Sequence, residues 1–257
     1  MNAIVRLNHA FDRAPNTPAG RAYKRARIVE AKFARQLRKV AQVVQDLING
    51  FDPTDPNIAE ILTVQLEAYA NLLDPWARSV AGRMIAEVNS RDYQGWKEAS
   101  ARIGRNLRRE IDDTPVGAVM QGLLNEQTKL ITSIPIEAAE RVRRVTLQGI
   151  TEGKRPAAYV AEIMRTGEVT RSRATLIART ETARTGAILQ RVRAESIGVT
   201  HYQWSTVGDS NVRPSHKKLN GKVFEYLNPP LCDAPDIHAN PGCVFNCRCI
   251  SIPIVTF

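Results

Sequence analysis

The cysteines of this 257-residue chain are confined to one short stretch near its end. All four lie between Cys232 and Cys249, and two of the four histidines, His216 and His238, lie inside this stretch or just before it. Thiolates and imidazoles crowded into so short a segment either bind a soft metal ion or cross-link a small fold. The cluster therefore restricts what the C-terminal region can fold into more than any other feature of the sequence.

The spacing of the cysteines favours a metal site. Cys247 and Cys249 are two residues apart, so in an extended segment both thiols point to one side and Arg248 points to the other. A region this small buries little apolar surface, and a bound metal would supply folding energy that its core cannot. We expect a structural zinc ion held by four of five residues, the four cysteines first and the histidine as the substitute: Cys232, His238, Cys243, Cys247 and Cys249. Because the paired Cys-x-x-Cys knuckles of a standard zinc finger are missing, disulfides and buried free thiols stay open as alternatives.

The composition is that of an ordinary soluble protein. Hydrophobic residues make up 43% and charged residues 24% of the chain, and its longest apolar runs are too short to cross a bilayer. The N-terminal sequence lacks the basic start and long apolar stretch of a secretory signal, so we expect synthesis in a cytosol without export by that route. In that reducing setting, clustered cysteines favour a metal over disulfides.

The formal net charge of +10 points to an acidic partner, either nucleic acid or an acidic protein surface. A merely soluble basic protein would show the same excess, because net charge governs association and not fold. Aromatic residues make up only 6% of the chain, which is too few for a platform that stacks single-stranded nucleic acid. The charge therefore restricts the class of partner without identifying one.

The first two thirds of the sequence show helical periodicity almost throughout. Apolar residues recur at steps of three and four, and prolines, glycines and aspartates separate the periodic segments. Thr170 is placed to cap the last long helix and Gly198 to end it. We predict helices over residues 20–49, 57–73, 76–111 with a candidate break near 89–95, one starting at 112–115, one from 133–135 to 149, a short one from 154–156 to about 167, and one over 171–196.

The predicted helix over 20–49 is amphipathic, and its polar face is strongly basic. One side carries an apolar stripe at helical spacing: Val29, Phe33, Leu37, Val40, Val44 and Leu47. The other side carries residues that we expect to contact DNA phosphates, without base specificity, or an acidic protein surface: Arg21, Lys24, Arg25, Lys32, Arg35, Arg38 and Lys39.

After Gly198 the periodicity changes from helical to alternating. Short runs with a period of two are separated by glycines, prolines and polar residues, which is typical of a small, loop-rich β region. The runs cover residues 200–206, 222–226 and 249–255. The sequence therefore predicts an α+β chain, with a mainly α-helical N-terminal body followed by a small β-rich, loop-rich C-terminal region.

Two groups of polar residues could link the last helix to this β region. Arg179 and Glu181 are two residues apart and do not face each other on a helix, so we expect each to find its partner in the region that follows. Asp209 and His216 could pair as a catalytic base and its orienting group, but no convincing nucleophile lies beside them. His216 could also be a metal ligand or a hydrogen-bonded structural residue. We expect Asp209 to close a turn onto the backbone just after it, and the group Asp209, Arg213 and His216 to organise the loop rather than to catalyse a reaction.

In combination, these motifs resemble a known family. The residues that carry the resemblance follow in this order: Arg179, Glu181, Trp204, Asp209, Arg213, His216, Gly221 and the run Asn246-Cys247-Arg248-Cys249. This order resembles the Mu F-like family of phage head morphogenesis proteins, also called minor head or minor capsid proteins. The resemblance covers about residues 135–255. It implies a family domain over 135–257, with helices to about residue 197 and the small β region over 198–257, after a helical body over 1–134.

The resemblance implies a structural, non-enzymatic role in a phage particle. Similar proteins are made with the portal and capsid, are present in few copies inside the head near the portal vertex, and are linked to head assembly, DNA packaging or genome delivery. The implied partners are the portal protein, the major capsid or scaffold protein and packaged double-stranded DNA, with no membrane. The implied location is the host cytoplasm during assembly and then the virion. Cys232 and Cys243 lie outside the family motif, so the zinc prediction rests on this chain's own residues.

An enzymatic alternative stays open. The His/Cys-rich C-terminal region could serve a metal-dependent nuclease or a toxin-like enzyme, which needs carboxylates or histidines around a hard metal with open positions. The cluster is rich in thiols and poor in acids, with Asp209, Asp233 and Asp236 as the nearby carboxylates. Thiolate sets usually make closed structural sites, which favours the structural interpretation.

Overall fold

The computed structural model describes residues 4–6, 18–52, 57–102 and 115–256 of the chain. These residues form two compact units, each assembled from segments that are far apart in the sequence. The first unit is made of the described parts of residues 1–30, 84–123 and 179–257, and the second is made of those of 31–83 and 124–178.

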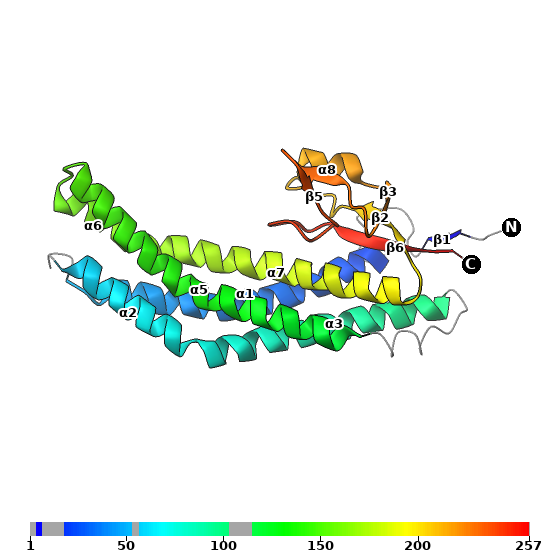
Figure 1. The fold of residues 1–257 in the computed structure, drawn as a ribbon, viewed down its shortest axis with the longest axis horizontal. Coiled ribbons are helices and arrows are strands. Elements are labelled where there is room, and N and C mark those ends of the chain that lie inside the picture. Colours follow the sequence, from blue (N-terminus) through cyan, green and yellow to red (C-terminus); the bar gives the residue numbers. More distant parts are fainter. Residues whose placement is uncertain (1–3, 7–17, 53–56, 103–114, 257) are drawn as a thin grey trace. The chain divides into compact units, whose positions relative to one another are not determined.

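Figure 1 shows the elements in chain order and confirms the predicted α+β class. The described helices are α1 (Pro18–Asn49), α2 (Ile58–Leu72), α3 (Asp74–Arg102), α5 (Val116–Thr151), α6 (Pro156–Met164), α7 (Thr166–Ser196) and α8 (Pro214–Leu219). The described strands are β1 (Ile4–Arg6), β2 (His201–Ser205), β3 (Val223–Glu225), β4 (Leu231–Asp233), β5 (Ile237–His238) and β6 (Ile250–Thr256). The boundary expected between residues 134 and 135 falls within α5.

The second unit is held together by one apolar core of helical side chains. Helices α1, α2, α5 and α6 contribute aliphatic residues to it: Val44, Ile48, Ile58, Leu62, Leu66, Ala138, Ala139, Val142 and Ile163. Burying each of the larger side chains stabilises the fold by about 1.5–3 kcal/mol. Gly149 allows α6 to approach α5 closely, because a Cβ at this position would lie 2.6 Å from Cδ1 of Tyr159.

Helix α5 corrects the prediction of two separate helices in this stretch. It runs unbroken from Val116 to Thr151 with Pro135 inside it. A proline inside a helix removes one backbone hydrogen bond and costs about 3 kcal/mol. Apolar side chains at helical spacing on both sides of the proline are buried: Ile131, Ile134, Ala138 and Val142. Burial of this stripe outweighs the local cost of the proline. The local sequence signal contains the cost of the proline but not the stabilisation from burial.

Two other helix boundaries also differ from the prediction. Helix α3 continues through residues 89–95, because the polar Asp92 takes a position on its inner face and pairs with Arg193 of α7. The carboxylate interrupts the apolar pattern without interrupting the helix. Helix α7 begins at Thr166, earlier than predicted, and the Thr170 hydroxyl donates to the Thr166 carbonyl oxygen at 2.7 Å, as a threonine does inside a helix rather than at its cap.

The strands predicted from alternating residues belong to a four-stranded sheet with the order β1-β6-β2-β3, in which each neighbouring pair is antiparallel. On β2 the alternation turns Tyr202 and Trp204 inward, and both are 0% exposed. Strands β4 and β5 form a separate two-stranded hairpin. The periodicity of the sequence did not predict β1, β4, β5 and α8, since elements this short carry no periodic signal.

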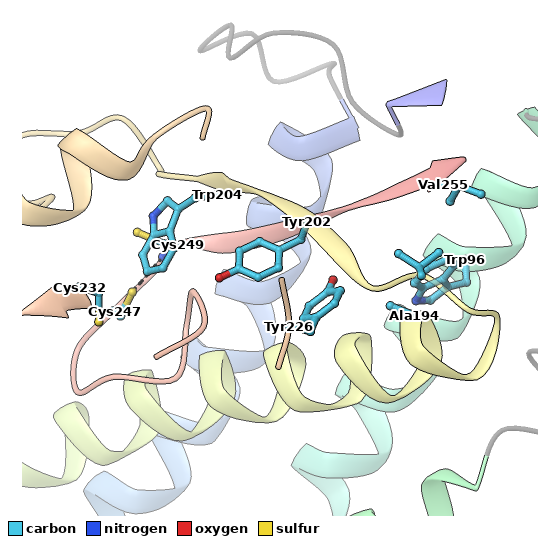
Figure 2. Packing of buried hydrophobic residues seen from close by; sticks show 10 residues of the cluster. Trp96, Ala194, Tyr202, Trp204, Tyr226, Cys232, Cys247, Cys249 and Val255 are labelled. Carbon is cyan, nitrogen blue, oxygen red and sulfur yellow. Dashed lines mark hydrogen bonds between the residues drawn. The ribbon is translucent and has the colours of Figure 1, made fainter. Parts of the chain in front are cut away.

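An aromatic core joins this sheet to α3 and α7 within the first unit. Figure 2 shows Tyr202 and Tyr226 in the middle of this core, with ring centroids 4.8 Å apart. Trp96 and Val255 lie toward one end, and Trp204 lies at the other end beside three of the cysteines. The thiols are therefore part of a packed core, and the end of the core that contains Trp204 holds the candidate site.

Candidate metal centre

Four buried side chains from three short segments form two overlapping groups in the first unit, with His216 common to both. His216 lies on α8, Cys232 lies on β4, and Cys247 and Cys249 lie in the loop that leads into β6. The Nδ1 atom of His216 is 3.5 Å from Sγ of Cys247 and 3.4 Å from Sγ of Cys249. In a second grouping, ligand atoms of His216, Cys232 and Asp233 lie within 4.8 Å of one another. None of the four thiol and imidazole residues is more than 4% exposed.

The sequence around α8 turns His216 inward. Arg213 is extended, and Pro214 takes the first helical position, where its fixed φ suits the helix and its missing N–H is not needed. In the turn that follows, His216 is buried while Lys217 and Lys218 are exposed. Trp204 covers the imidazole edge-on, with ring centroids 5.3 Å apart and an angle of 78° between the rings.

The motif residue Gly221 closes the turn between α8 and β3. Its φ is +80°, a left-handed conformation that favours glycine. Its N–H donates to the Trp204 carbonyl oxygen at 2.8 Å, and its own carbonyl oxygen accepts from Nε2 of Gln203 at 2.8 Å. This turn fixes Trp204 beside the imidazole that it covers.

Polar contacts hold the thiol-bearing loop on α7. Asn246 adopts φ of +56°, which asparagine tolerates better than most residues. Its backbone N–H donates to Oγ1 of Thr180 at 3.0 Å, and its side-chain Oδ1 accepts from Nη1 of Arg179 at 3.1 Å. Arg179 also pairs with Glu30 of α1 at 3.2 Å. Arg179 therefore connects the long helix both to the loop that carries the thiols and to α1.

Glu181, the other motif residue on α7, has a buried side chain. It is 6% exposed, and its Oε2 lies 3.5 Å from Nη1 of Arg184, one turn further along. This ion pair lies within α7, and the expected link from Glu181 to the β region stays a prediction.

A shell of charged residues surrounds the loop. Asp209 Oδ1 accepts from the backbone N–H of Asn211 at 3.0 Å, which closes the turn that the sequence predicts. Arg248 pairs with the same carboxylate at 2.8 Å on the side of the loop opposite the thiols. Arg213 donates to the carbonyl oxygen of Phe245 at 2.7 Å. These contacts join the two loops that carry His216 and the thiols.

Asp233 lies behind the imidazole. Its carboxylate is 3.5 Å from Nε2 of His216, on the ring side away from the two sulfurs. Ser215 donates to it at 3.2 Å, and Arg213 lies 3.4 Å away. A carboxylate held in this position orients a histidine ring and fixes which nitrogen carries the proton.

The two loop thiols interact with each other and with His216. The Cys249 thiol donates to Sγ of Cys247 and, together with the contact from His216, lowers the pKa of Cys247 well below its usual value. The backbone N–H of Cys249 also donates to this sulfur at 3.4 Å. The same interaction with Cys247, followed by burial, raises the pKa of Cys249. A cation at this point would bind both sulfurs as thiolates, because metal ligation requires the deprotonated form.

Cys243 and His238, which the sequence placed among the expected zinc ligands, lie apart from this centre. Among the described residues, neither belongs to a grouping that could hold a metal ion. His238 is exposed, and its Nδ1 is 3.0 Å from the Pro229 carbonyl oxygen. Cys243 is half-buried, and burial raises the pKa of its thiol to about 11. In the structure all four cysteines are free thiols.

His216 is the ligand candidate that the predicted zinc set did not include. Nearness in sequence favoured His238, but the structure packs α8 against β4 and so brings His216 to the thiols. The available sequence signal for His216 was its position in the family motif.

The basic residues predicted to contact DNA lie largely on the exposed side of α1. Arg25 is half-buried and pairs with Glu98 at 3.2 Å, and the side chain of Arg21 lies outside the described residues. The other five are exposed: Lys24, Lys32, Arg35, Arg38 and Lys39. None of the helices in the described segments combines the length and the apolar content needed to span a membrane.

The chain is similar to known sequences over its second half and beyond. Residues 140–252 match the family model described as "Phage Mu protein F like protein". A Haemophilus influenzae protein that carries the description "Uncharacterized protein" is 32% identical over 173 residues, which make up 65% of this chain. The chain covers 38% of that relative's length. No solved structure matches the chain.

Proposed function

We propose that the chain, whose residues 140–252 match the phage Mu protein F-like family model, is a structural minor head protein of a tailed phage. In this role it lies inside the capsid, at or near the portal vertex, and acts in head assembly and in DNA packaging or delivery. Its partners are the portal protein and the major capsid or scaffold protein. It is made in the host cytoplasm and carried in the virion.

The family match carries this proposal. The matched residues include α6, α7, α8 and the strands from β2 to β5, and they end within β6. They therefore contain every residue of the candidate metal centre. The motif residues around that centre hold turns and loops in place. Such contacts keep the shape of the domain constant, which suits a structural component of a particle.

The burial of the centre also supports a structural role. The imidazole of His216 is 2% exposed and lies under the ring of Trp204. Catalytic metal sites keep one position open for water or substrate, whereas structural sites are closed by protein ligands. A closed cluster suits a protein whose task is to keep its shape inside a particle.

The exposed basic face of α1 supports contact with packaged DNA. Its lysines and arginines are spaced along one helix and would meet phosphates without reading bases. Such contacts release counterions, so the affinity should fall steeply as salt rises.

The decisive test is the composition of purified particles. The phage genes for this chain, portal and capsid are expressed together, and heads are separated on a density gradient. We expect the chain in the head fraction by mass spectrometry, and fewer DNA-filled heads when its gene is removed. The matched control is the triple variant Arg35→Glu/Arg38→Glu/Lys39→Glu, which should still enter heads if the family region directs incorporation. Heads that lack the chain while the free pool contains it would contradict the proposal.

The nuclease alternative has one observation in its favour, the pairing of His216 with Asp233 beside two thiols. It predicts DNA cleavage by the purified chain with magnesium or manganese, abolished by His216→Ala. Cleavage that survives this substitution, or no cleavage at all, leaves the structural proposal in place.

A further inference from the structure

We propose that His216, Cys232, Cys247 and Cys249 together bind one zinc ion, with Asp233 as the residue that orients the histidine. Such a site goes beyond the role in the phage head and does not depend on it. Its ligand set also replaces the one expected from sequence, in which His238 and Cys243 took part.

The distances around His216 fit the edges of a tetrahedral zinc site. With zinc about 2.3 Å from sulfur and about 2.0 Å from nitrogen, tetrahedral geometry places a sulfur and a nitrogen ligand about 3.5 Å apart. The two observed distances from Nδ1 of His216 are 3.5 Å to Cys247 and 3.4 Å to Cys249. A single ring nitrogen cannot donate well to two sulfurs at once, whereas one cation between the three atoms satisfies all of them.

The local backbone presents both loop thiols to the same point. Cys247 and Cys249 are two residues apart, and the Cys249 N–H donates to Sγ of Cys247 at 3.4 Å. This hydrogen bond stabilises negative charge on the sulfur, as a metal-bound thiolate requires. Arg248, between them, pairs with Asp209 at 2.8 Å.

Cys232 supplies the fourth ligand. Its Sγ lies within 4.8 Å of a His216 nitrogen, and its side chain is 1% exposed. Figure 2 shows Cys232 beside Cys247 at the end of the core. Its thiol donates to the Ile237 carbonyl oxygen at 3.3 Å, and metal binding would replace this weak contact.

Asp233 orients the imidazole ring of His216 from the side opposite the thiols. Its carboxylate faces Nε2 of His216 at 3.5 Å, and this nitrogen has no hydrogen-bond partner within the described part of the chain. When Nδ1 binds a metal, Nε2 carries the ring proton and can donate it to this carboxylate. Ser215 and Arg213 hold the carboxylate in place.

The ligand chemistry selects zinc. Three thiolates and one imidazole in a buried, closed arrangement match a structural Cys₃His zinc site, while magnesium and calcium prefer oxygen ligands. The ion would join α8, the β4–β5 hairpin and the loop before β6. Each of these is short, and α8 has only 6 residues and β5 only 2, so the packed surface between them is small. A metal that binds the folded arrangement adds its binding energy to folding.

Metal analysis of the full chain tests the site. We expect about one zinc per chain by elemental mass spectrometry after purification without added chelator. Single variants Cys247→Ser, Cys249→Ser, Cys232→Ser and His216→Ala should lose most of the zinc. The matched controls Cys243→Ser and His238→Ala should keep it, because both residues lie outside the centre. Equal loss in the controls and the ligand variants would overturn the assignment of ligands.

A second measurement covers variants that fail to fold. Cobalt(II) is substituted into the wild-type chain, and its absorption spectrum reports the ligand set. We expect strong visible bands of tetrahedral cobalt and a thiolate charge-transfer band, both removed by added zinc. Zinc-edge X-ray absorption should show sulfur and nitrogen ligands in a ratio of about 3 to 1. Octahedral cobalt, or a zinc-free wild-type chain whose cysteines form disulfides, would refute the site. A zinc-free chain that still enters phage heads would refute the zinc site alone and leave the proposed function intact.

Discussion

Arg193 of α7 and Asp92 of α3 form a buried ion pair whose disruption should strongly destabilise the first unit. The side chain of Arg193 is 3% exposed and that of Asp92 is 15% exposed. Arg193 also donates to Oδ1 of Asn89 at 2.6 Å. The change Arg193→Met keeps most of the side-chain length but leaves the carboxylate without its counter-charge. Removing one partner of a buried pair costs about 3–5 kcal/mol, and we expect a loss of about this size in the free energy of unfolding near neutral pH.

The loss should depend on pH in a defined direction. Burial raises the pKa of Asp92 to about 6, and Arg193 limits this rise. Because the folded pKa lies above the unfolded value, the folded state binds the proton more tightly, and the stability from this group is present at low pH and lost as pH rises from about 4 to 6. Without Arg193 the pKa of Asp92 rises further. The defect of Arg193→Met should therefore be smallest near pH 5, where both proteins carry a protonated Asp92, and should grow by up to about 1.4 kcal/mol for each pH unit above about 6.

Amide hydrogen exchange with urea titration measures this effect locally, which matters because the chain has two compact units and its unfolding need not be two-state. Peptides from the second half of α3 and of α7 report on the unit that holds the pair. The matched control is Arg191→Met, which removes an exposed arginine paired with Glu195 on the same helix and should cost less than about 1 kcal/mol. The double variant Asp92→Asn/Arg193→Met should recover part of the loss. A cost of Arg193→Met that is no larger than that of Arg191→Met, or that is the same at both pH values, would refute this account of the pair.

Other parts of the structure give three predictions of the same kind. Gly149→Ala should lower the stability of the second unit by about 1–3 kcal/mol in urea titration, because the new Cβ meets the ring of Tyr159 at 2.6 Å, whereas Gly122→Ala, with open space around it on the same helix, should be neutral or stabilising. Arg35→Glu/Lys39→Glu should weaken the binding of double-stranded DNA, measured by fluorescence anisotropy. The slope of log affinity against log salt should fall by about 0.9 for each phosphate that is no longer neutralised. An unchanged slope would show that this face of α1 does not contact DNA. A strong chelator should increase hydrogen exchange in α8, in the β4–β5 hairpin and in the loop before β6 while α2 keeps its protection; uniform exchange in both conditions would argue against a structural metal.

Much of the fold could be predicted from spacing along the chain. The stripe of Val29, Phe33 and Leu37 is buried on α1 as its period indicates, and Tyr202 and Trp204 turn inward on β2 as their alternation indicates. Both patterns depend on the geometry of a single helix or strand, so the local sequence contains the whole signal. The same holds for the turn at Asp209, which one side chain closes onto its own backbone.

The errors occurred where a distant segment decides the outcome. Pro135 was taken as a helix start because its local cost is high, yet the buried stripe around it keeps α5 intact. A break was expected near residues 89–95, where Asp92 has its partner Arg193 on another helix. The ligand set was drawn from residues close in sequence, and His216 was left out because α8 itself was not predicted. In each case the missing information was a contact between segments.

The amino-acid sequence by itself determined which residues share a face, the α+β class, the family model that residues 140–252 match, and the supply of thiols and imidazoles at the C-terminal end. These properties follow from residue identity and spacing, which the covalent chain sets directly. The tertiary structure alone decided which sulfurs lie beside which histidine, and which charged pair is buried between α3 and α7. Which residues meet in the fold depends on packing between segments far apart in the chain. The hydrophobic effect stabilises the burial of apolar surface wherever that surface lies in the sequence, so a local motif does not specify these contacts.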